Sequence, residues 1–202
     1  MTTDPAVLAE YESRARTYDA SAVHRALAGA VVDFARPDGA GTVVDVATGT
    51  GLVLRILARR SPSARTVGLD LAPSMLAVAR DALPRATLLR ADAAALPLAD
   101  GCADLVTCVT ALHLLPDPTP VLREWARVLR PGGRAVTATF RIADRPAGSR
   151  GFPTFHTRTA SPAALARTVA PAGLRVTRHR TWDHDSGDSL LLAELEPVPR
   201  TA

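Results

Sequence analysis

The spacing of apolar positions changes near residue 42, and the change separates two kinds of predicted element. Before it, apolar residues recur at helical intervals over roughly 5–17, where Asp4 can cap the helix, and over roughly 21–35. After it, short β-branched runs alternate with helical patterns. The predicted strands are 42–47, 66–71, 86–91, 103–109, 133–140, 174–182 and 189–196, and the predicted helices between them are 51–60, 73–82, 118–130 and 161–171.

Strands that alternate with helices form a parallel sheet covered on both faces, which is a doubly wound, Rossmann-like α/β fold. The last two strands are separated only by the five residues 184–188, too few for a crossover helix, so we expect them to pair as an antiparallel hairpin. The prediction is therefore a seven-stranded, mostly parallel sheet with a C-terminal antiparallel hairpin and an N-terminal helical lid.

Length and composition place the chain among single-domain proteins without a membrane span. The 202 residues suit one domain, and no apolar run approaches the roughly 20 residues that cross a bilayer. The N-terminus lacks the pattern of a secretory signal, which predicts a cytoplasmic location. Cys102 and Cys108 fit a reducing compartment, and with the five histidines they follow no zinc spacing, so we expect no metal.

All 24 basic residues are arginine, and this excludes whole classes of enzyme. Without lysine the chain cannot be a P-loop protein, a Schiff-base enzyme or a Tyr-x-x-x-Lys dehydrogenase. Residues 121–180 hold 12 arginines against only Glu124 and Asp144. This excess would attract an anionic substrate, an acidic carrier protein or nucleic acid, and a solvated arginine face is the alternative.

The segment VVDVATGTG at 43–51 indicates a ligand site, because it is a strand that enters a glycine-containing turn before a helix. Asp70 closes the next strand, where an acid can accept hydrogen bonds from ribose hydroxyls. Together they indicate an adenosine-type ligand. Leu54 stands where a dinucleotide site would have a third glycine, which argues against NAD or FAD.

Two further segments complete a pattern: residues 88–118, which contain LLRADAAALPLADG, and residues 123–140, REWARVLRPGGRAVTATF. In order and spacing over about 42–140, the chain resembles the class I S-adenosylmethionine-dependent methyltransferases of the small type 11 branch. That branch includes the ubiquinone and menaquinone biosynthesis methyltransferases. The resemblance implies S-adenosyl-L-methionine as the cofactor and S-adenosyl-L-homocysteine as the product.

The resemblance also divides the single domain, 1–202, into three parts. Residues 1–40 would be a helical cap and residues 41–140 the cofactor-binding core. Residues 141–202 would supply a substrate-side loop, a helix and the terminal hairpin. Because the cap is small, a second copy could complete the cleft, so both a monomer and a homodimer stay open.

The family's cofactor contacts fall on three stretches of this chain. The turn under the methionine moiety would be formed by Asp45, Ala47, Thr48, Gly49 and Gly51. The adenosine would be held by Asp70 at both ribose hydroxyls, by Leu71 and Met75 beside the adenine, and by Asp92 and the Ala93 backbone at its amino edge. Val109 would offer its carbonyl to the methionine amine. Ala47 replaces the family's usual first glycine, and we expect a negative φ there.

The N-terminal segment carries both tyrosines of the chain, seven residues apart on one helix face. Ala15–Asp19 resembles the A-x-x-Tyr-Asp segment with which similar methyltransferases close over the cofactor, so Tyr18 is assigned to the lid and Tyr11 to the acceptor. Arg14 or Arg16 would pair with the methionine carboxylate. The alternative is a docked helix with exposed arginines.

The acceptor side has weaker signals. His113 follows the fourth strand and is the candidate general base, with a merely packed histidine as the alternative. His156 and Asp144 are further candidates in the 141–160 loop. Four arginines of that loop predict an acceptor with a carboxylate or phosphate, or one presented on an acidic carrier protein: Arg141, Arg145, Arg150 and Arg158. Residues 182–188 could bind a metal but are more typical of a turn.

The sequence leaves three alternative functions. The first is in-line methyl transfer to a small molecule, anionic or carrier-bound. The second is methylation of RNA or DNA, which is disfavoured because the chain lacks an Asn/Asp-Pro-Pro-Tyr motif and a Pro-Cys nucleophile and has few aromatic residues for base stacking. The third is a cofactor-binding protein of this fold without methyl transfer, in a cyclase-type or binding role.

Overall fold

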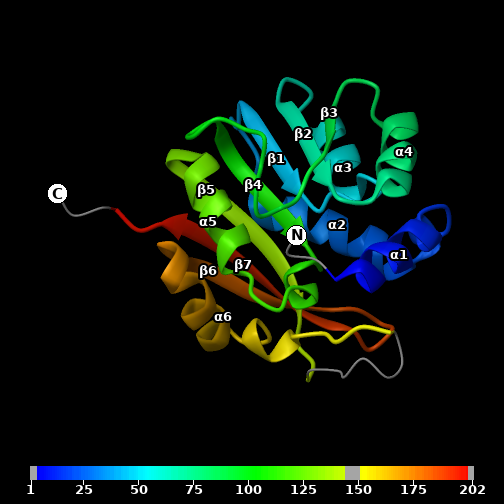
Figure 1. The fold of residues 1–202 in the computed structure, drawn as a ribbon. Helices are drawn as coiled ribbons and strands as arrows, with labels where there is room; N and C mark the ends of the chain where they lie inside the picture. Colours follow the sequence, from blue (N-terminus) through cyan, green and yellow to red (C-terminus); the bar gives the residue numbers. More distant parts are fainter. Residues whose placement is uncertain (1–3, 144–150, 200–202) are drawn as a thin grey trace.

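The computed structural model describes residues 4–143 and 151–199, and these form one sheet of seven strands in the order β3-β2-β1-β4-β5-β7-β6 (Figure 1). The strands are β1 (Thr42–Val46), β2 (Arg65–Asp70), β3 (Thr87–Arg90), β4 (Ala103–Val109), β5 (Leu129–Phe140), β6 (Leu174–Asp183) and β7 (Ser189–Pro197). The helices are α1 (Pro5–Arg14), α2 (Ala22–Ala35), α3 (Leu52–Arg60), α4 (Pro73–Ala82), α5 (Thr119–Val128) and α6 (Pro162–Val169). The predicted fold class is therefore confirmed.

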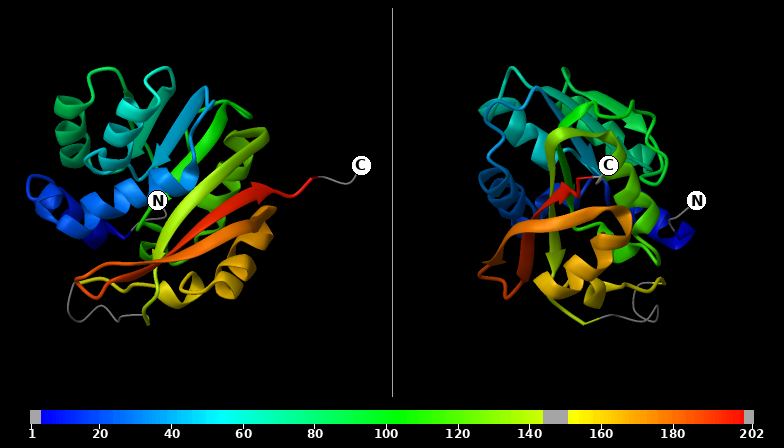
Figure 2. Two further views of the ribbon diagram at one scale, coloured as in Figure 1. Left: turned by 180° about the vertical axis from the view of Figure 1, so that it is seen from behind. Right: turned by 90° about the vertical axis from the view of Figure 1, so that its left-hand side faces the viewer.

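The C-terminal hairpin is antiparallel, as predicted, and joins the sheet through its second strand. β7 pairs antiparallel with both β5 and β6, whereas the pairs among β1 to β5 are parallel. Figure 2 shows the hairpin as a long curved ribbon beyond β5, with α6 packed beneath it. The hairpin tip is thereby carried to the same end of the molecule as the residues that follow β5.

Both faces of the sheet are buried, which explains why its strands are continuously apolar. Val43 and Leu105 lie in a cluster with the apolar sides of α2 and α3. Their neighbours Val44 and Val106 point to the opposite face, against α5 and α6. Trp125 of α5 is completely buried in that second cluster. Within the described residues, none of the helices has the length and apolarity to cross a bilayer.

The first helix is shorter than the predicted 5–17. Asp4 caps it, accepting a hydrogen bond from the backbone N–H of Ala6 at 2.8 Å, as expected. The helix ends at Arg14, and the chain then turns through the short 3₁₀ helix Tyr18–Ala20. Asp19 of this turn accepts a hydrogen bond from the Thr50 hydroxyl and forms an ion pair with Arg55 at 2.7 Å. These contacts hold the turn against α3 and would be lost if α1 continued.

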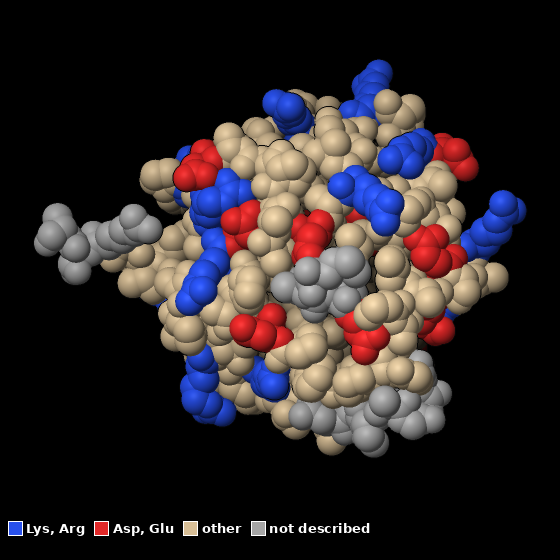
Figure 3. Space-filling view, viewed as in Figure 1, with Lys and Arg blue, Asp and Glu red and all other residues tan. Residues whose placement is uncertain are grey.

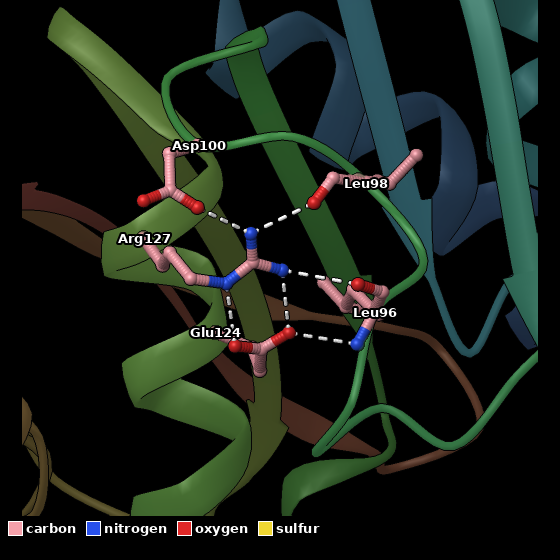
Figure 4. Close-up of polar contacts among 5 residues, drawn as sticks. All are labelled: Leu96, Leu98, Asp100, Glu124 and Arg127. Atoms are coloured by element: carbon pink, nitrogen blue, oxygen red, sulfur yellow. Dashed lines mark hydrogen bonds and ion pairs between the residues drawn. The ribbon is translucent and has the colours of Figure 1, made fainter.

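Arg127 on α5 organises the long connection between β3 and β4 (Figure 4). Its guanidinium donates to both carboxylate oxygens of Glu124, each at 2.7 Å, and to the carbonyls of Leu96 and Leu98 at 3.0 and 2.7 Å. It also contacts Asp100 at 2.7 Å. The hydrogen bond from Arg127 holds the pKa of Glu124 below its ordinary value. The loop is thus fixed to the helix through one side chain.

Five of the ten described arginines of residues 121–180 form ion pairs with acids, most of them from neighbouring segments. Figure 3 shows arginine side chains along the side of the molecule that carries α5 and α6, with acidic side chains among them. Arg134 and Arg178 share Glu194, and Arg175 pairs with Glu196. Arg127 and Arg130 also form ion pairs. The local excess in the sequence is therefore not an equal excess of unpaired charge.

Candidate functional site

The strand order places a cleft at the carboxyl ends of the paired strands β1 and β4. The chain runs outward from β1 to β2 and β3 and then returns to β4, so β1 and β4 are the strands at which the order reverses. Ligands of doubly wound folds bind at the carboxyl ends of such strands. In Figure 1 the arrowhead of β1 points toward α1 and α2. Ala47 and Thr110, the residues that follow these strands, both have left-handed backbones, with φ of 55° and 54°.

An apolar pocket lies at this cleft, and most of the predicted cofactor residues line it. From the turn after β1 and from β2 and α4 come Ala47, Gly49, Asp70, Leu71 and Met75. From the ends of β3 and β4 come Ala93 and Val109, and from the N-terminal segment come Tyr11 and Tyr18. Residues as far apart in the sequence as Tyr11 and Val109 are thus brought to one cavity of about 110 Å³.

Asp70 is the one carboxylate among the residues that line this apolar pocket. One of its oxygens accepts a hydrogen bond from the backbone N–H of Gly49 at 2.8 Å, and the other accepts from Ala72 at 2.9 Å. Burial raises the pKa of Asp70, and the hydrogen bonds from Ala72 and Gly49 oppose that rise. Asp70 therefore braces the glycine turn as well as facing the pocket, a double role that the motif did not indicate.

The remaining residues of the predicted set lie around the apolar pocket and support it. Gly51 starts α3 with φ of 81°, and a Cβ there would lie 2.6 Å from Cδ1 of Leu83. Gly51 thus permits close packing of α3 on α4. Asp92 accepts a hydrogen bond from the backbone N–H of Ala94 at 3.0 Å, which forms a turn beside Ala93. Its predicted contact with the adenine stays a prediction.

Asp45 and Thr48 form a buried hydrogen-bond network under the glycine turn. The Asp45 carboxylate accepts hydrogen bonds from the hydroxyls of Thr48 at 2.7 Å and Thr107 at 2.6 Å. It links the turn after β1 to β4. Burial raises the pKa of Asp45 to about 6, although both hydroxyls act in the opposite direction.

We expect the raised pKa of Asp45 to appear in the pH dependence of stability. Between about pH 4 and pH 6 the unfolded chain has released this proton and the folded chain still holds it, so the free energy of unfolding falls as pH rises. The slope approaches about 1.4 kcal/mol per pH unit. Asp45→Asn should remove this slope, measured by urea unfolding at several pH values. Parallel profiles for the variant and the wild type would contradict the prediction.

The expected negative φ at Ala47 is wrong. Its φ of 55° follows from the tight turn, in which the backbone N–H of Thr48 donates to the Leu69 carbonyl at 2.9 Å and Gly51 donates to the Thr48 carbonyl at 2.9 Å. The site therefore needs the conformation that the family's glycine adopts readily, and alanine adopts it at a cost of roughly 1 kcal/mol.

Ala47→Gly should therefore stabilise the protein. We expect a gain of about 0.5–1 kcal/mol, because relief of the backbone strain exceeds the added freedom of the unfolded chain. The matched control is Ala111→Gly, at a residue with φ of −116°, which should destabilise by a similar amount. Thermal unfolding of both variants measures the difference, and a loss of stability in both would contradict the strain.

Polar contacts of Glu12 and Asp19 hold the N-terminal segment, α1 and the 3₁₀ helix after it, against α4 and α3. Glu12 accepts hydrogen bonds from the backbone N–H of Ser74 at the start of α4, with oxygens at 3.1 and 3.4 Å. Asp19 holds the other end to α3. Sequence reasoning missed the contact of Glu12 with Ser74 and those of Asp19 with Thr50 and Arg55, because these partners are more than 30 residues away.

Tyr18 lies where the lid meets the cleft. Its ring stacks on His24, with centroids 4.4 Å apart and planes at 18°, and its hydroxyl is hydrogen-bonded to Thr110. Burial raises the pKa of Tyr18, so the hydroxyl stays protonated. The guanidinium of Arg14 lies 5.8 Å from this ring and 5.9 Å from that of Tyr11. Of the two predicted arginines, Arg14 faces the cleft, and Arg16 is exposed.

A second pocket, polar and about 180 Å³ in volume, adjoins the first through Tyr18 and Thr110, which line both. It contains His113 and His156, which the sequence proposed separately. Their rings stack with centroids 4.3 Å apart and planes at 14°, and Phe140 meets both edge-on. The backbone N–H of Phe155 donates to the carbonyl of His113 at 2.7 Å, which joins the two loops.

Two of the four predicted arginines of the 141–160 loop, Arg141 and Arg158, belong to the described residues. Asp144, Arg145 and Arg150 lie outside the described residues, so their predicted roles stay predictions. Arg158 donates to the carbonyl of Pro116 and covers the ring of Phe155, and Arg141 donates to Ser189.

The hairpin tip forms the turn that its composition favoured. The backbone N–H of Gly187 donates to the carbonyl of His184 at 2.8 Å, and the Ser186 hydroxyl donates to Asp188 at 2.7 Å. Asp188 also lines the polar pocket. Across residues 4–143 and 151–199 no three metal-ligating side chains are grouped so that they could hold a metal ion.

The strand order, the glycine turn after β1 and the acid that ends β2 together define the class of the protein as a Rossmann-like methyltransferase fold. Residues 44–137 match the family model described as a methyltransferase domain. The match supports, for these residues, the resemblance seen in the sequence to the class I S-adenosylmethionine-dependent methyltransferases of type 11.

Two curated relatives of similar sequence are methyltransferases, and a solved structure has a similar fold. The chain is 42% identical over 113 residues to a demethylmenaquinone methyltransferase of Thermus thermophilus, covering 54% of this chain and 51% of the relative. It is 39% identical over 148 residues to a malonyl-[acyl-carrier protein] O-methyltransferase of Laribacter hongkongensis, covering 66% and 50%. The chain thus spans about half the length of these relatives. In fold it is similar to the DhpI–SAH complex, with a TM-score of 0.72, 24% identity and coverage of 96% and 97%.

The residues present fit the cofactor of this family, S-adenosylmethionine. Gly49 is a cradle, because its φ of 56° suits glycine and its missing side chain leaves the pocket open in front of Met75, whose sulfur would lie 3.9 Å from a Cβ. Asp70 supplies a carboxylate for ribose hydroxyls, and apolar Leu71 and Ala93 flank the space for a base. The chemistry of this donor set matches a nucleoside without a phosphate.

Proposed function

We propose that the protein is an S-adenosylmethionine-dependent methyltransferase that acts on a small molecule. The observation that carries the proposal is the pair of pockets that meet at Tyr18 and Thr110. The apolar one has the chemistry of a nucleoside site, and the polar one has the size and mixed lining of an acceptor site. Two adjoining sites with a shared wall are what a transfer reaction needs.

The chain's own residues bind and align the reactants. Asp70 would hold the ribose hydroxyls, and Gly49 would leave space for the methionine moiety, whose amine would meet the carbonyl of Val109. When bound, the cofactor supplies an activated methyl group on a sulfonium. Tyr18, which is half-buried and hydrogen-bonded to Thr110, would close the junction and limit the entry of water.

The finer part of the proposal is an acceptor that is anionic or presented on an acidic carrier protein. Arg14 in the polar pocket supports an anionic group. One relative is a malonyl-[acyl-carrier protein] O-methyltransferase, which supports a carrier-bound acceptor. The cytoplasmic location stays a prediction of the sequence.

The test is transfer of tritium from [methyl-³H]S-adenosylmethionine. The wild type is incubated with malonyl-[acyl-carrier protein], 4-hydroxybenzoate and a tRNA pool, with heat-denatured protein as the control. Label in a small acceptor or on the carrier-bound acyl group is the expected result. Label in RNA, steeply dependent on salt, would instead identify a nucleic-acid enzyme. Tight cofactor binding without any labelled product would favour the role without methyl transfer.

A further inference from the structure

The polar pocket has the lining of a separate binding site. Two of its histidines, His113 and His156, and its Thr154 do not line the apolar pocket. Its volume of about 180 Å³ is far above the roughly 10–15 Å³ that one water needs. Aromatic faces come from Tyr11, Tyr18 and Phe140. A compact molecule with one ring is the size and shape that such a lining accommodates.

The stacked histidines line this pocket together with two other basic side chains, Arg14 and His24. His113 is 5% exposed and His156 is 3% exposed, and the ring stacking holds both imidazoles at the wall. A neutral imidazole accepts a proton, so a pair of imidazoles at the wall of this pocket is suited to general-base chemistry.

Thr154 provides an independent sign that a polar ligand enters the pocket. Its side chain is only 4% exposed, and within the described structure its hydroxyl has no hydrogen-bond partner. A buried hydroxyl without a partner costs free energy unless a ligand or water satisfies it. Phe152, Thr154 and His156 are all buried, so alternate side chains of this segment point inward. Thr154 is thus held toward the pocket that it lines.

Arg14 is the arginine among the described residues that line the polar pocket. Its guanidinium lies near the rings of Tyr11 and Tyr18 and lines the pocket, with Glu10 as an ion-pair partner at 3.5 Å. The pocket's acid, Asp188, is engaged by the Ser186 hydroxyl. Arginine matches a carboxylate through two parallel hydrogen bonds. The lining thus offers a guanidinium for a carboxylate as well as imidazoles that can accept a proton.

From these contacts we infer that the acceptor is a hydroxylated aromatic acid, methylated on its hydroxyl oxygen, with the His113–His156 pair as the general base. A carboxylate arrives ionised and needs no base, whereas a phenol must lose a proton, so the imidazoles fit the hydroxyl and Arg14 fits the carboxylate. The phenolic O–H proton passes to an imidazole nitrogen as the oxygen forms its bond to the methyl carbon. The sulfur keeps the electron pair of the bond that breaks, and the imidazolium then releases its proton to water. This inference rests on the proposed function.

The first test measures binding and needs no turnover. The protein loaded with S-adenosylhomocysteine is titrated calorimetrically with 4-hydroxybenzoate. We expect saturable binding of 4-hydroxybenzoate, about 10-fold weaker in Arg14→Gln and also weaker in Thr154→Val, and Thr154→Val should retain the affinity for S-adenosylhomocysteine. Arg16→Gln, at an exposed arginine of the same segment, is the matched control and should bind as the wild type does. Wild type that binds S-adenosylhomocysteine but not 4-hydroxybenzoate would overturn the acceptor class.

The second test separates a base from a merely packed ring. H113F/H156F keeps two aromatic rings and removes the imidazoles. We expect kcat for 4-hydroxybenzoate to fall about 100-fold or more with little change in KM. With 4-hydroxy-3-nitrobenzoate, whose phenol is already ionised at neutral pH, kcat should change less than about 3-fold. His179→Phe, an exposed histidine on β6, is the control and should match the wild type with both probes.

The results distinguish a wrong acceptor or base from a wrong proposed function. Equal loss with both probes in H113F/H156F would overturn the base, since a structural defect does not distinguish them. If that variant does not fold, as judged by thermal melting, the binding results for Arg14→Gln and Thr154→Val decide the acceptor site. Failure of the wild type to bind S-adenosylhomocysteine would overturn the proposed function itself, whereas binding of S-adenosylhomocysteine without methylation of either acid would overturn the inference alone.

Discussion

Asp70→Ala is expected to weaken the binding of S-adenosylhomocysteine by about 100-fold. The carboxylate would accept hydrogen bonds from two ribose hydroxyls, and bonds to a charged group contribute about 1.5–3 kcal/mol each. It also accepts hydrogen bonds from the backbone N–H groups of Gly49 and Ala72, so its loss loosens the turn that forms the pocket. Isothermal titration calorimetry measures the affinity directly.

Two variants control for this result. Asp81→Ala removes an exposed acid from α4, the helix that follows Asp70, and should bind as the wild type does. Asp70→Asn keeps the shape of the side chain and should lie between alanine and wild type, because an amide accepts hydrogen bonds less strongly than a carboxylate. If Asp70→Ala binds with wild-type affinity, the ribose contact is wrong.

Arg127→Met is expected to lower the free energy of unfolding by about 3 kcal/mol. Methionine preserves packing by the side-chain stem but removes the donors to Glu124, Leu96 and Leu98. The side chain of Glu124 is 16% exposed, so its carboxylate would keep its desolvation without its partner. Asp100 is 80% exposed and adds little.

The pH dependence of this effect has a definite sign. Arg127 lowers the pKa of Glu124 in the folded state, so the stabilisation is complete above the ordinary pKa of glutamate and is lost as pH falls through the lowered one. The gap between wild type and Arg127→Met should therefore shrink between neutral pH and about pH 3, as measured by urea unfolding. Arg123→Met, an exposed arginine of the same helix, should change little. A gap that grows in acid would contradict the ion pair.

Most of the fold was predictable from the sequence, because each strand and helix has its own local pattern. The hairpin shows this clearly: five residues between β6 and β7 leave room for a turn only, and the strands pair antiparallel. Boundaries were less accurate where distant contacts decide them. α1 ends early because Asp19 is held by Thr50 and Arg55, and β5 starts at Leu129, which pairs with Ala103 before a bulge.

The cofactor side of the site was also predictable, since its residues lie in short motifs at the ends of strands. Asp70, Gly49 and Met75 line one pocket as their motifs implied. The backbone conformation of Ala47 was not predictable, because the turn imposes a positive φ that an alanine in the sequence does not indicate.

The acceptor side needed the three-dimensional structure. His113 and His156 are 43 residues apart in the sequence, and nothing local indicates that their rings stack. Thr154 has no motif at all, and only its burial without a hydrogen-bond partner draws attention to it. The tip of the hairpin brings Asp188 to the same pocket. Such convergence depends on the packing of loops, which single-sequence patterns do not encode.

The central claim is that the cleft at the carboxyl ends of β1 and β4 binds S-adenosylmethionine. The most direct measurement is calorimetric titration of the wild-type protein with S-adenosylhomocysteine and, in parallel, with NAD⁺. We expect one site per chain for S-adenosylhomocysteine with a dissociation constant of about 1–100 μM, or roughly −8 to −5.5 kcal/mol, and no binding of NAD⁺. NAD⁺ binding without S-adenosylhomocysteine binding, or no binding of either, would contradict it.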